Sequence, residues 1–165
     1  MNRAFLIRPI RPGDDAAVAA TIRAVMTELG CAGPGFAIHD QEVDRMSASY
    51  ASREARYYVL VAPDGELLGG AGFARLAGSD PAAATCELRK MYFRPAARGQ
   101  GLGAQLLDLL LDEMRAAGFA RCYLETTSWM HTAQALYRSR GFVAQSCGEG
   151  ATGHHGCDVF YARAL

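Results

Sequence analysis

The segment RGQGLGA, residues 98–104, is the part of the sequence whose residue types most clearly suggest chemistry. Gly99, Gly101 and Gly103 alternate directly before a leucine-rich run, which favours a turn that opens a helix. Backbone N–H groups at a helix start bind phosphate, and glycines let a phosphate approach the backbone closely. Because Arg98 adds a mobile positive charge at the rim, we expect this segment to hold a phosphorylated ligand.

Several interpretations of this segment compete. Gly99, Gly101 and Ala104 match the dinucleotide pattern G-x-G-x-x-[GA]. Glu125 follows at a distance suited to a ribose-binding acid. That pattern, however, belongs directly after a strand, whereas residues 94–98 intervene here. A nucleoside-triphosphate loop requires a lysine and a hydroxyl that this segment lacks. The pyrophosphate of coenzyme A and a plain tight turn remain as interpretations.

The elements that must position this segment follow from hydrophobic periodicity and turn signals. The predicted order is strand, two helices, three strands, helix, strand, helix and two strands, which indicates a mixed sheet covered by helices. Strands are predicted at 5–11, 56–61, 66–76, 85–93, 121–126, 142–146 and 159–164, and helices at 16–29, 40–52, 102–117 and 129–138. The polar residues of the helix at 40–52 predict a surface position.

Length and composition favour one soluble domain, residues 1–165. Seventeen basic residues balance seventeen acidic ones, so we expect neither a nucleic-acid nor a membrane partner. The five cysteines are scattered, which argues against a disulfide framework or a structural zinc site. The opening residues contain no apolar stretch long enough for a signal peptide, so a cytoplasmic location is expected.

Two stretches resemble the signature of the GNAT superfamily of acetyltransferases: ELRKMYFRPAARGQGLGAQLL and CYLETTSWMHTAQALYRSRGF. Arg98, Gly101 and Gly103 fit the superfamily pattern [RQ]-x-x-G-x-[GA], and the run to TGHHGCD resembles small bacterial members. The resemblance implies an α/β (α+β mixed) acyl-CoA N-acyltransferase fold with a mostly antiparallel sheet. It also implies direct acetyl transfer from acetyl-CoA to an amine, without a covalent enzyme intermediate and without a metal.

The resemblance also assigns residues to acetyl-CoA. Backbone groups near the end of one strand would pair with the pantetheine arm, and the Met91 N–H is the candidate donor to the acetyl oxygen. The glycine segment would hold the pyrophosphate. The expected cofactor residues are Met91, Tyr92, Phe93, Arg98, Gly99, Gln100, Gly101, Leu102 and Gly103.

Two catalytic roles are implied in the same way. Tyr137 stands where the family places a general acid toward the coenzyme A thiolate, although a tyrosine here can also simply pack a helix. Glu87 stands where some members place a general base, with Glu125 as an alternative. Glu87 could equally face solvent or pair with Arg89 or Lys90.

The acceptor is expected to be a small-molecule or amino-acid-like amine. A protein or peptide acceptor, and a noncatalytic acetyl-CoA sensor, remain alternatives. His154 could touch the acceptor, whereas no metal site is expected at His154, His155 and Cys157. Met130 replaces an asparagine often found in the family. Trp129 with Met130 could line the acyl cavity, but Trp129 is expected to pack the helix. A homodimer is implied only by the resemblance.

Overall fold

The computed structural model describes residues 4–165 and contains one seven-stranded sheet. Residues 1–3, part of the stretch in which we expect no signal peptide, lie outside the described residues. The strands are β1 (Leu6–Pro9), β2 (Arg56–Val61), β3 (Leu67–Arg75), β4 (Thr85–Phe93), β5 (Arg121–Thr126), β6 (Val143–Gln145) and β7 (Val159–Ala164). The helices are α1 (Asp15–Glu28), α2 (Met46–Ser49), α3 (Leu102–Ala116) and α4 (His131–Ser139).

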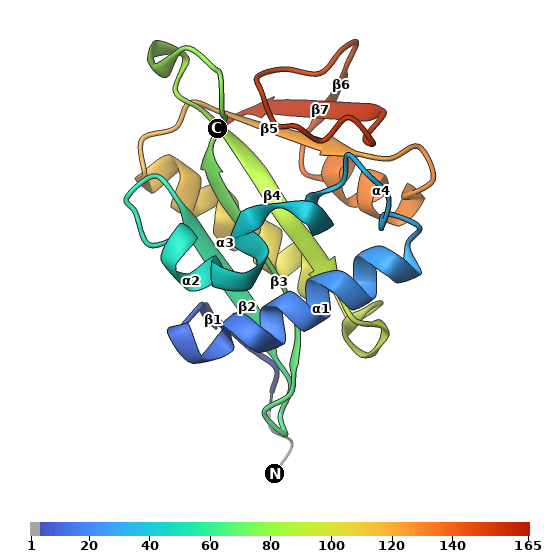
Figure 1. Cartoon of the computed structure of the whole chain (residues 1–165). Coiled ribbons are helices and arrows are strands. Elements are labelled where there is room, and N and C mark those ends of the chain that lie inside the picture. The colour runs from blue at the N-terminus through green and yellow to red at the C-terminus, as the bar shows by residue number, and fades with distance from the viewer. Residues whose placement is uncertain (1–3) are drawn as a thin grey trace.

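The sheet has the strand order β1-β2-β3-β4-β5-β7-β6 (Figure 1). Five of its six strand pairs are antiparallel, and β4 with β5 is the parallel pair. The turn at Pro63-Asp64-Gly65 joins β2 to β3 as a hairpin, where the Gly65 N–H donates to the Ala62 carbonyl at 2.9 Å. The predicted element order and the mostly antiparallel sheet are therefore confirmed.

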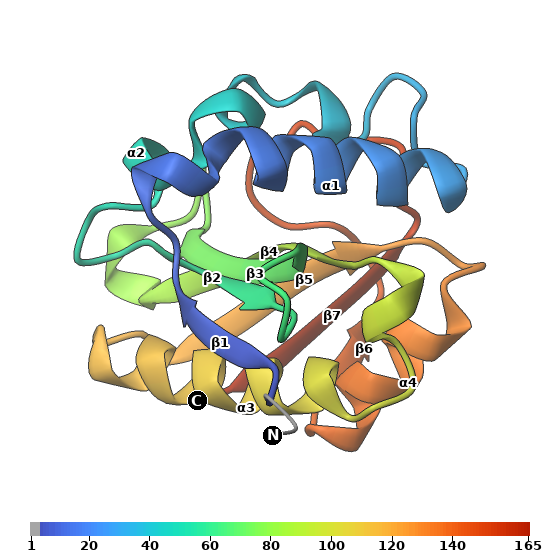
Figure 2. The ribbon, with the colours of Figure 1, turned by 90° about the horizontal axis from the view of Figure 1, so that it is seen from below.

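Helices cover both faces of the sheet. Figure 2 shows α1 and α2 on one face and α3 and α4 on the other. The apolar stripe of α3 is buried as its spacing predicts, and each buried leucine or methionine contributes about 1.5–3 kcal/mol. Its buried residues are Leu102, Leu106, Leu107, Leu110, Leu111 and Met114. None of the helices within residues 4–165 combines the length and apolarity that a membrane crossing requires.

The predicted helix at 40–52 is wrong in form. A 3-10 segment at Gln41–Arg45 is followed by the single turn of α2. The backbone breaks at Arg45, with φ −144° and ψ 44°, and the Ser47 N–H donates to the Asp15 carboxylate at 2.7 Å. Val43 and Met46 are buried, as the spacing of three and four residues predicts. The segment is held against α1 by side-chain contacts and does not form one continuous helix.

Other boundaries shift by a few residues. Helix α4 begins at His131 rather than at Trp129, because the backbone at Met130 is not helical, with φ −82° and ψ 62°. The Trp129 indole N–H donates to the Leu29 carbonyl at 2.9 Å, and the residue is 48% exposed. The expectation that Trp129 packs the helix is therefore not met. The first, third and sixth strands are shorter than predicted, whereas β2, β4, β5 and β7 have the predicted bounds.

Candidate active site

Strands β4 and β5 separate from each other halfway along their length. Their parallel pairing joins residues 85–87 to residues 121–123 and, within the described sheet, extends no further. From Leu88 to Phe93 the edge of β4 borders a cavity of about 510 Å³, whose opposite wall includes Leu124 and Thr126. An unpaired strand edge can bind an extended ligand through its backbone groups. The separation therefore forms a channel for an elongated ligand within the sheet.

A bulge at Lys90 bends β4 beside this cavity. Lys90 has a φ of 50°, which is uncommon for a residue other than glycine, and the register with β3 shifts between Gly70 and Gly72. The Tyr57 hydroxyl reaches across β3 and donates to the Lys90 carbonyl at 2.9 Å. A Cβ atom on Gly70 or Gly72 would lie 2.6 Å from the Tyr57 ring. These glycines therefore allow Tyr57 to hold the bulge.

The cavity brings together nearly all residues expected to bind acetyl-CoA. Gln100 is the exception, because its exposed side chain donates to the Ala96 carbonyl at 2.7 Å, away from the cavity lining. The lining includes Met91, Tyr92, Phe93, Arg98, Gly99, Gly101, Leu102 and Gly103. Residues from the strand end and from the following loop thus share one surface.

The glycine segment forms the start of α3. Gly99 and Gly101 have φ values of 73° and 74°, a conformation that glycine adopts without strain. The Gln105 N–H makes the first intrahelical bond, to the Gly101 carbonyl at 3.1 Å, so the preceding amides of the first turn lack helical acceptors. No acidic side chain lies in that turn. The segment can therefore receive an anion.

Arg98 is not the mobile charge that the sequence suggests. Its Nη1 and Nη2 atoms bind the Glu28 carboxylate of α1 at 2.7 and 3.0 Å. Its Nε atom donates to the Phe93 carbonyl at 2.8 Å. The pair lies at the cavity rim with both side chains more than a third exposed, so solvent screens it. Arg98 is held in place beside the glycine segment.

Tyr137 is buried in α4 and lines the same cavity. Its ring packs against Phe142 and Tyr161, with centroid distances of 5.9 and 6.3 Å. Within residues 4–165 its hydroxyl makes no hydrogen bond. Burial raises the pKa of Tyr137 well above its ordinary value, so the phenol keeps its proton at neutral pH. Packing and proton donation are therefore compatible at this residue.

Glu87 is buried, with 3% of its surface exposed, so the expectation that it faces solvent is wrong. Its Oε2 atom accepts from Arg89 Nε at 2.7 Å, which agrees with the alternative that it pairs with Arg89. Burial raises the pKa of Glu87, and the charges of Arg89 and His154 only partly oppose this effect. A carboxyl group with a raised pKa at a cavity wall suits proton transfer.

Lys90 is fully buried between two carboxylates. Its Nζ atom lies 2.6 Å from Asp40 Oδ2 and also contacts Glu42, which accepts from the Tyr50 hydroxyl at 2.7 Å. Lys90 therefore does not face solvent or pair with Glu87. Asp40 and Glu42 point into the molecule from the segment that was predicted to be a surface helix.

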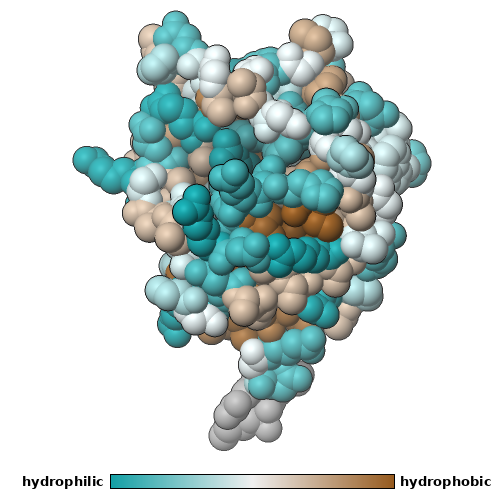
Figure 3. All heavy atoms as spheres, in the orientation of Figure 1, coloured by the Kyte–Doolittle hydropathy of each residue, from teal (hydrophilic) through white to brown (hydrophobic). Residues whose placement is uncertain are grey.

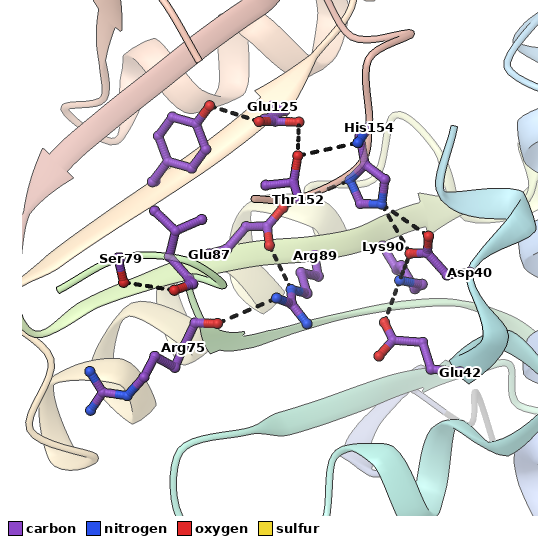
Figure 4. Close-up of polar contacts among 12 residues, drawn as sticks. Asp40, Glu42, Arg75, Ser79, Glu87, Arg89, Lys90, Glu125, Thr152 and His154 are labelled. Atoms are coloured by element: carbon purple, nitrogen blue, oxygen red, sulfur yellow. Dashed lines mark hydrogen bonds and ion pairs between the residues drawn. The ribbon is translucent and has the colours of Figure 1, made fainter. Parts of the chain in front are cut away.

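His154 connects this cluster to Glu87 (Figure 4). Its Nε2 atom lies 3.0 and 3.1 Å from the Asp40 oxygens, and its Nδ1 atom lies 3.9 Å from Glu87 Oε1. Its backbone N–H donates to Thr152, whose hydroxyl donates to Glu125 at 2.9 Å. Residues from two strands and two loops therefore meet at one point.

A second cavity, of about 340 Å³, lies on the other side of this cluster. Its lining shares three side chains with the first cavity, namely Glu87, Arg89 and His154. Most of its lining is polar or charged. Figure 3 shows that the face presented in Figure 1 is largely hydrophilic, with an apolar patch recessed near its centre. A molecule bound in the second cavity would therefore reach the first cavity at Glu87.

Sequence reasoning did not identify Asp40, Glu42 or Thr152 as parts of this site. A lysine within a mostly buried strand was the available signal, because a lysine is rarely buried without partners. That signal does not identify the residues that pair with Lys90. The contacts of Lys90 lie 50 and 48 residues earlier in the chain.

The remaining candidates are placed as follows. Met130 precedes α4, lines the first cavity and accepts a weak hydrogen bond from Thr126 at 3.5 Å, so no amide replaces the asparagine usual at this position. The His155 ring lies against Gly35, whereas the His154 ring contacts Asp40. The two adjacent histidines thus have different neighbours.

Comparison with known proteins gives a consistent result. A model of the acetyltransferase (GNAT) family matches residues 23–142. A protein of Escherichia coli (strain K12), described as the uncharacterized N-acetyltransferase YjgM, is 40% identical over 161 residues, which cover 97% of this chain and 95% of that protein.

Solved structures with the same fold are more distant in sequence. A GNAT-family acetyltransferase of Staphylococcus aureus Mu50 has a TM-score of 0.82 at 18% identity, covering 98% of this chain and 99% of that one. YncA of Salmonella typhimurium, solved with its cofactor acetyl-CoA, has a TM-score of 0.75 at 24% identity, covering 98% and 94%.

Proposed function

The chain belongs to the acetyltransferase (GNAT) family, and from this premise we propose that it transfers the acetyl group of acetyl-CoA directly to a primary amine. The acceptor is a small molecule, such as an amino-acid-like amine, and both substrates are bound at the same time. The observation that carries this proposal is the pair of cavities that share Glu87, Arg89 and His154.

Acetyl-CoA is assigned to the larger cavity. The free edge of β4 at Met91–Phe93 suits the pantetheine arm, and the first amides of α3 with Arg98 suit the pyrophosphate. The absence of side chains at Gly99 and Gly101 supports this assignment, because it leaves the approach to these amides open. The bound thioester supplies an activated acetyl group.

The acceptor is assigned to the smaller cavity. Its lining carries both signs of charge, with Glu87 and Asp40 able to meet an ammonium group and Arg45 and Arg89 able to meet an acid group. The volume of about 340 Å³ suits a small molecule. An amino-acid-like acceptor would satisfy both kinds of charge.

The residues can manage the protons of the reaction. An ammonium acceptor must lose a proton before its nitrogen attacks, and Glu87 is the candidate base. The N–C bond forms as the C–S bond breaks, while the Met91 N–H is assigned to the acetyl oxygen. Tyr137 then gives its proton to the departing thiolate. It takes up the second proton that the amine nitrogen releases. The net proton leaves to solvent.

The first test is calorimetric titration of the protein with acetyl-CoA and, separately, with NADH. We expect acetyl-CoA to bind and NADH not to bind. Gly101→Asp and Gly101→Asn form a matched pair, because both side chains tolerate a positive φ and differ mainly in charge. Gly101→Asp is expected to abolish the binding of acetyl-CoA. Gly101→Asn is expected to weaken this binding only modestly.

A preference for NADH, or equal binding by the two variants, would contradict the assignment of the glycine segment. Gly65 has a φ of 97° in the distant β2–β3 turn, so Gly65→Asp controls for strain and added charge elsewhere. A screen of amines with and without a carboxylate then tests the acceptor class. Acetylation of peptides alone would overturn the small-molecule assignment.

A further inference from the structure

The two carboxylate oxygens of Glu87 have different surroundings. Oε2 is held by Arg89 Nε at 2.7 Å. Oε1 faces His154 Nδ1 at 3.9 Å (Figure 4). The oxygen that is free to take a proton is therefore the one beside the imidazole.

Asp40 fixes the tautomer of His154. The Nε2 atom lies within 3.1 Å of both Asp40 oxygens, and a carboxylate accepts hydrogen bonds, so the neutral ring carries its proton on Nε2. Nδ1 then presents a lone pair toward Glu87. A carboxylate that orients an imidazole in this way holds the ring ready to accept a second proton.

We propose that His154, oriented by Asp40, receives the proton that Glu87 removes from the acceptor amine. The inference rests on the proposed function, since it concerns the same reaction. The proton moves from the amine nitrogen to Glu87 Oε1 and then to His154 Nδ1. Glu87 returns to its charged form, while the imidazolium is stabilised by Asp40, and no electron transfer is involved.

Glu87 lies in the wall of both cavities and its side chain is 4% exposed, so bound substrates would limit the access of water to it. A neighbouring proton acceptor then gives the proton a route away from Glu87. The Asp40 side chain is 27% exposed, so the chain from Glu87 through His154 leads toward solvent. The 3.9 Å gap must close to about 2.8 Å, or be bridged by one water molecule, for the transfer to occur.

The charges around His154 come from several elements. Asp40 comes from the segment before α2, Glu87, Arg89 and Lys90 come from β4, and Glu125 comes from β5. Burial lowers the pKa of His154, but the hydrogen bond and charge of Asp40 and the charge of Glu87 together raise it above its ordinary value, with Lys90 opposing. His154 and Glu87 therefore titrate as a coupled pair.

The coupling can be measured without any acetylation assay. We would follow the histidine ring signals by NMR between pH 4 and 9 in the wild-type protein and in Glu87→Gln. The expected result is a lower pKa for His154 in Glu87→Gln, because a nearby negative charge is lost. An unchanged His154 pKa would overturn the proposal.

The catalytic consequence is tested with His154→Gln and the matched control His155→Gln on the same loop. We expect His154→Gln to lower kcat roughly 10²-fold, with the affinity for acetyl-CoA unchanged. His155→Gln should behave as wild type. Equal kcat values in the two variants would refute the role of His154.

The shape of the pH profile separates this role from a structural one. In the wild type, the fall of kcat at low pH should reflect the ionisations of both Glu87 and His154. In His154→Gln it should reflect the ionisation of Glu87 alone. Asp40→Asn should move this limb to lower pH, because Asp40 raises the His154 pKa. His154→Asn provides a second variant if the first does not fold. If the wild type acetylates no amine, the proposed function fails, and the NMR titration still decides whether the pair exists.

Discussion

The guanidinium group of Arg98 and the carboxylate of Glu28 form a two-pronged ion pair, with N–O distances of 2.7 and 3.0 Å, at the rim of the larger cavity. The pair joins the last turn of α1 to the loop that precedes α3. Arg98 is also the cation closest in sequence to the amides assigned to the pyrophosphate. Glu28 therefore competes with an anionic ligand for the same group.

Removal of this competitor should strengthen cofactor binding. We expect Glu28→Gln to lower the Kd for acetyl-CoA by about two- to fivefold at low salt, with a smaller gain at 0.5 M salt because exposed charges are screened. Arg98→Gln should raise the Kd. Calorimetric titration at two salt concentrations measures both effects, and a weaker affinity in Glu28→Gln would show that the pair supports the site.

The pH dependence of activity should reveal how Arg89 tunes Glu87. Burial raises the pKa of Glu87 and Arg89 lowers it, so loss of the cation in Arg89→Gln should move the acid limb of kcat to higher pH. The base must be deprotonated, so activity is lost as the pH falls through this limb. Steady-state rates from pH 5 to 9 provide the check. An unchanged limb would exclude Glu87 as the titrating base.

Tyr137 is expected to act in the chemical step. Tyr137→Phe should lower kcat roughly 10²-fold with little change in the Kd for acetyl-CoA, because the ring still packs against Phe142 and Tyr161. Tyr161→Phe is a suitable control, although it also removes the hydrogen bond to Gln134 and the one received from Arg138. If Tyr137→Phe lowered the free energy of unfolding enough to account for the loss of activity, Tyr137 would have a packing role instead.

The ion cluster around Lys90 should be important for stability. Lys90→Met leaves Asp40 and Glu42 partly buried without their cation, and loss of one partner from a buried pair costs about 3–5 kcal/mol. Arg115→Met removes an exposed pair with Asp112 and should change stability little. Urea unfolding of both variants measures the difference. A small effect in Lys90→Met would mean that water reaches the two carboxylates.

Acid should weaken the same cluster. Burial raises the pKa values of Asp40 and Glu42, but their charged and hydrogen-bonded partners together lower both below the ordinary range. For Asp40 these partners are His154 and Lys90, and for Glu42 they are chiefly Lys90 and Tyr50. Their contribution to stability is therefore complete above the ordinary carboxyl pKa of about 4 and is lost as the pH falls below it. Denaturant unfolding between pH 3 and 7 should show this loss in the wild type, and the slope should be smaller in Glu42→Gln.

Local patterns were sufficient for the arrangement of elements. The alternation in TCELRKMYF gave β4 its bounds, and the leucine spacing after Gly101 gave α3 its buried face, because both signals arise within one element. The residues assigned to acetyl-CoA could be named because they lie close together in the chain and follow a recognisable pattern.

The acceptor side could not be predicted in the same way. The contact between His154 and Asp40 joins residues 114 positions apart, and that between Lys90 and Asp40 joins residues 50 positions apart. The residue types of Asp40, Lys90 and His154 do not specify which of them contact each other. The separation of β4 from β5 is equally hidden, since both strands have ordinary strand patterns and their pairing ends at Glu87 and Tyr123 without a break in either pattern.

The wall of Glu87, Arg89 and His154 between the two cavities also bears on how products leave. After transfer, coenzyme A would lie along β4 and beside the start of α3, while the acetylated molecule would lie in the smaller cavity near Arg45 and Thr152. On this assignment the two products would occupy chambers whose linings share only Glu87, Arg89 and His154. We therefore expect that either product can leave first.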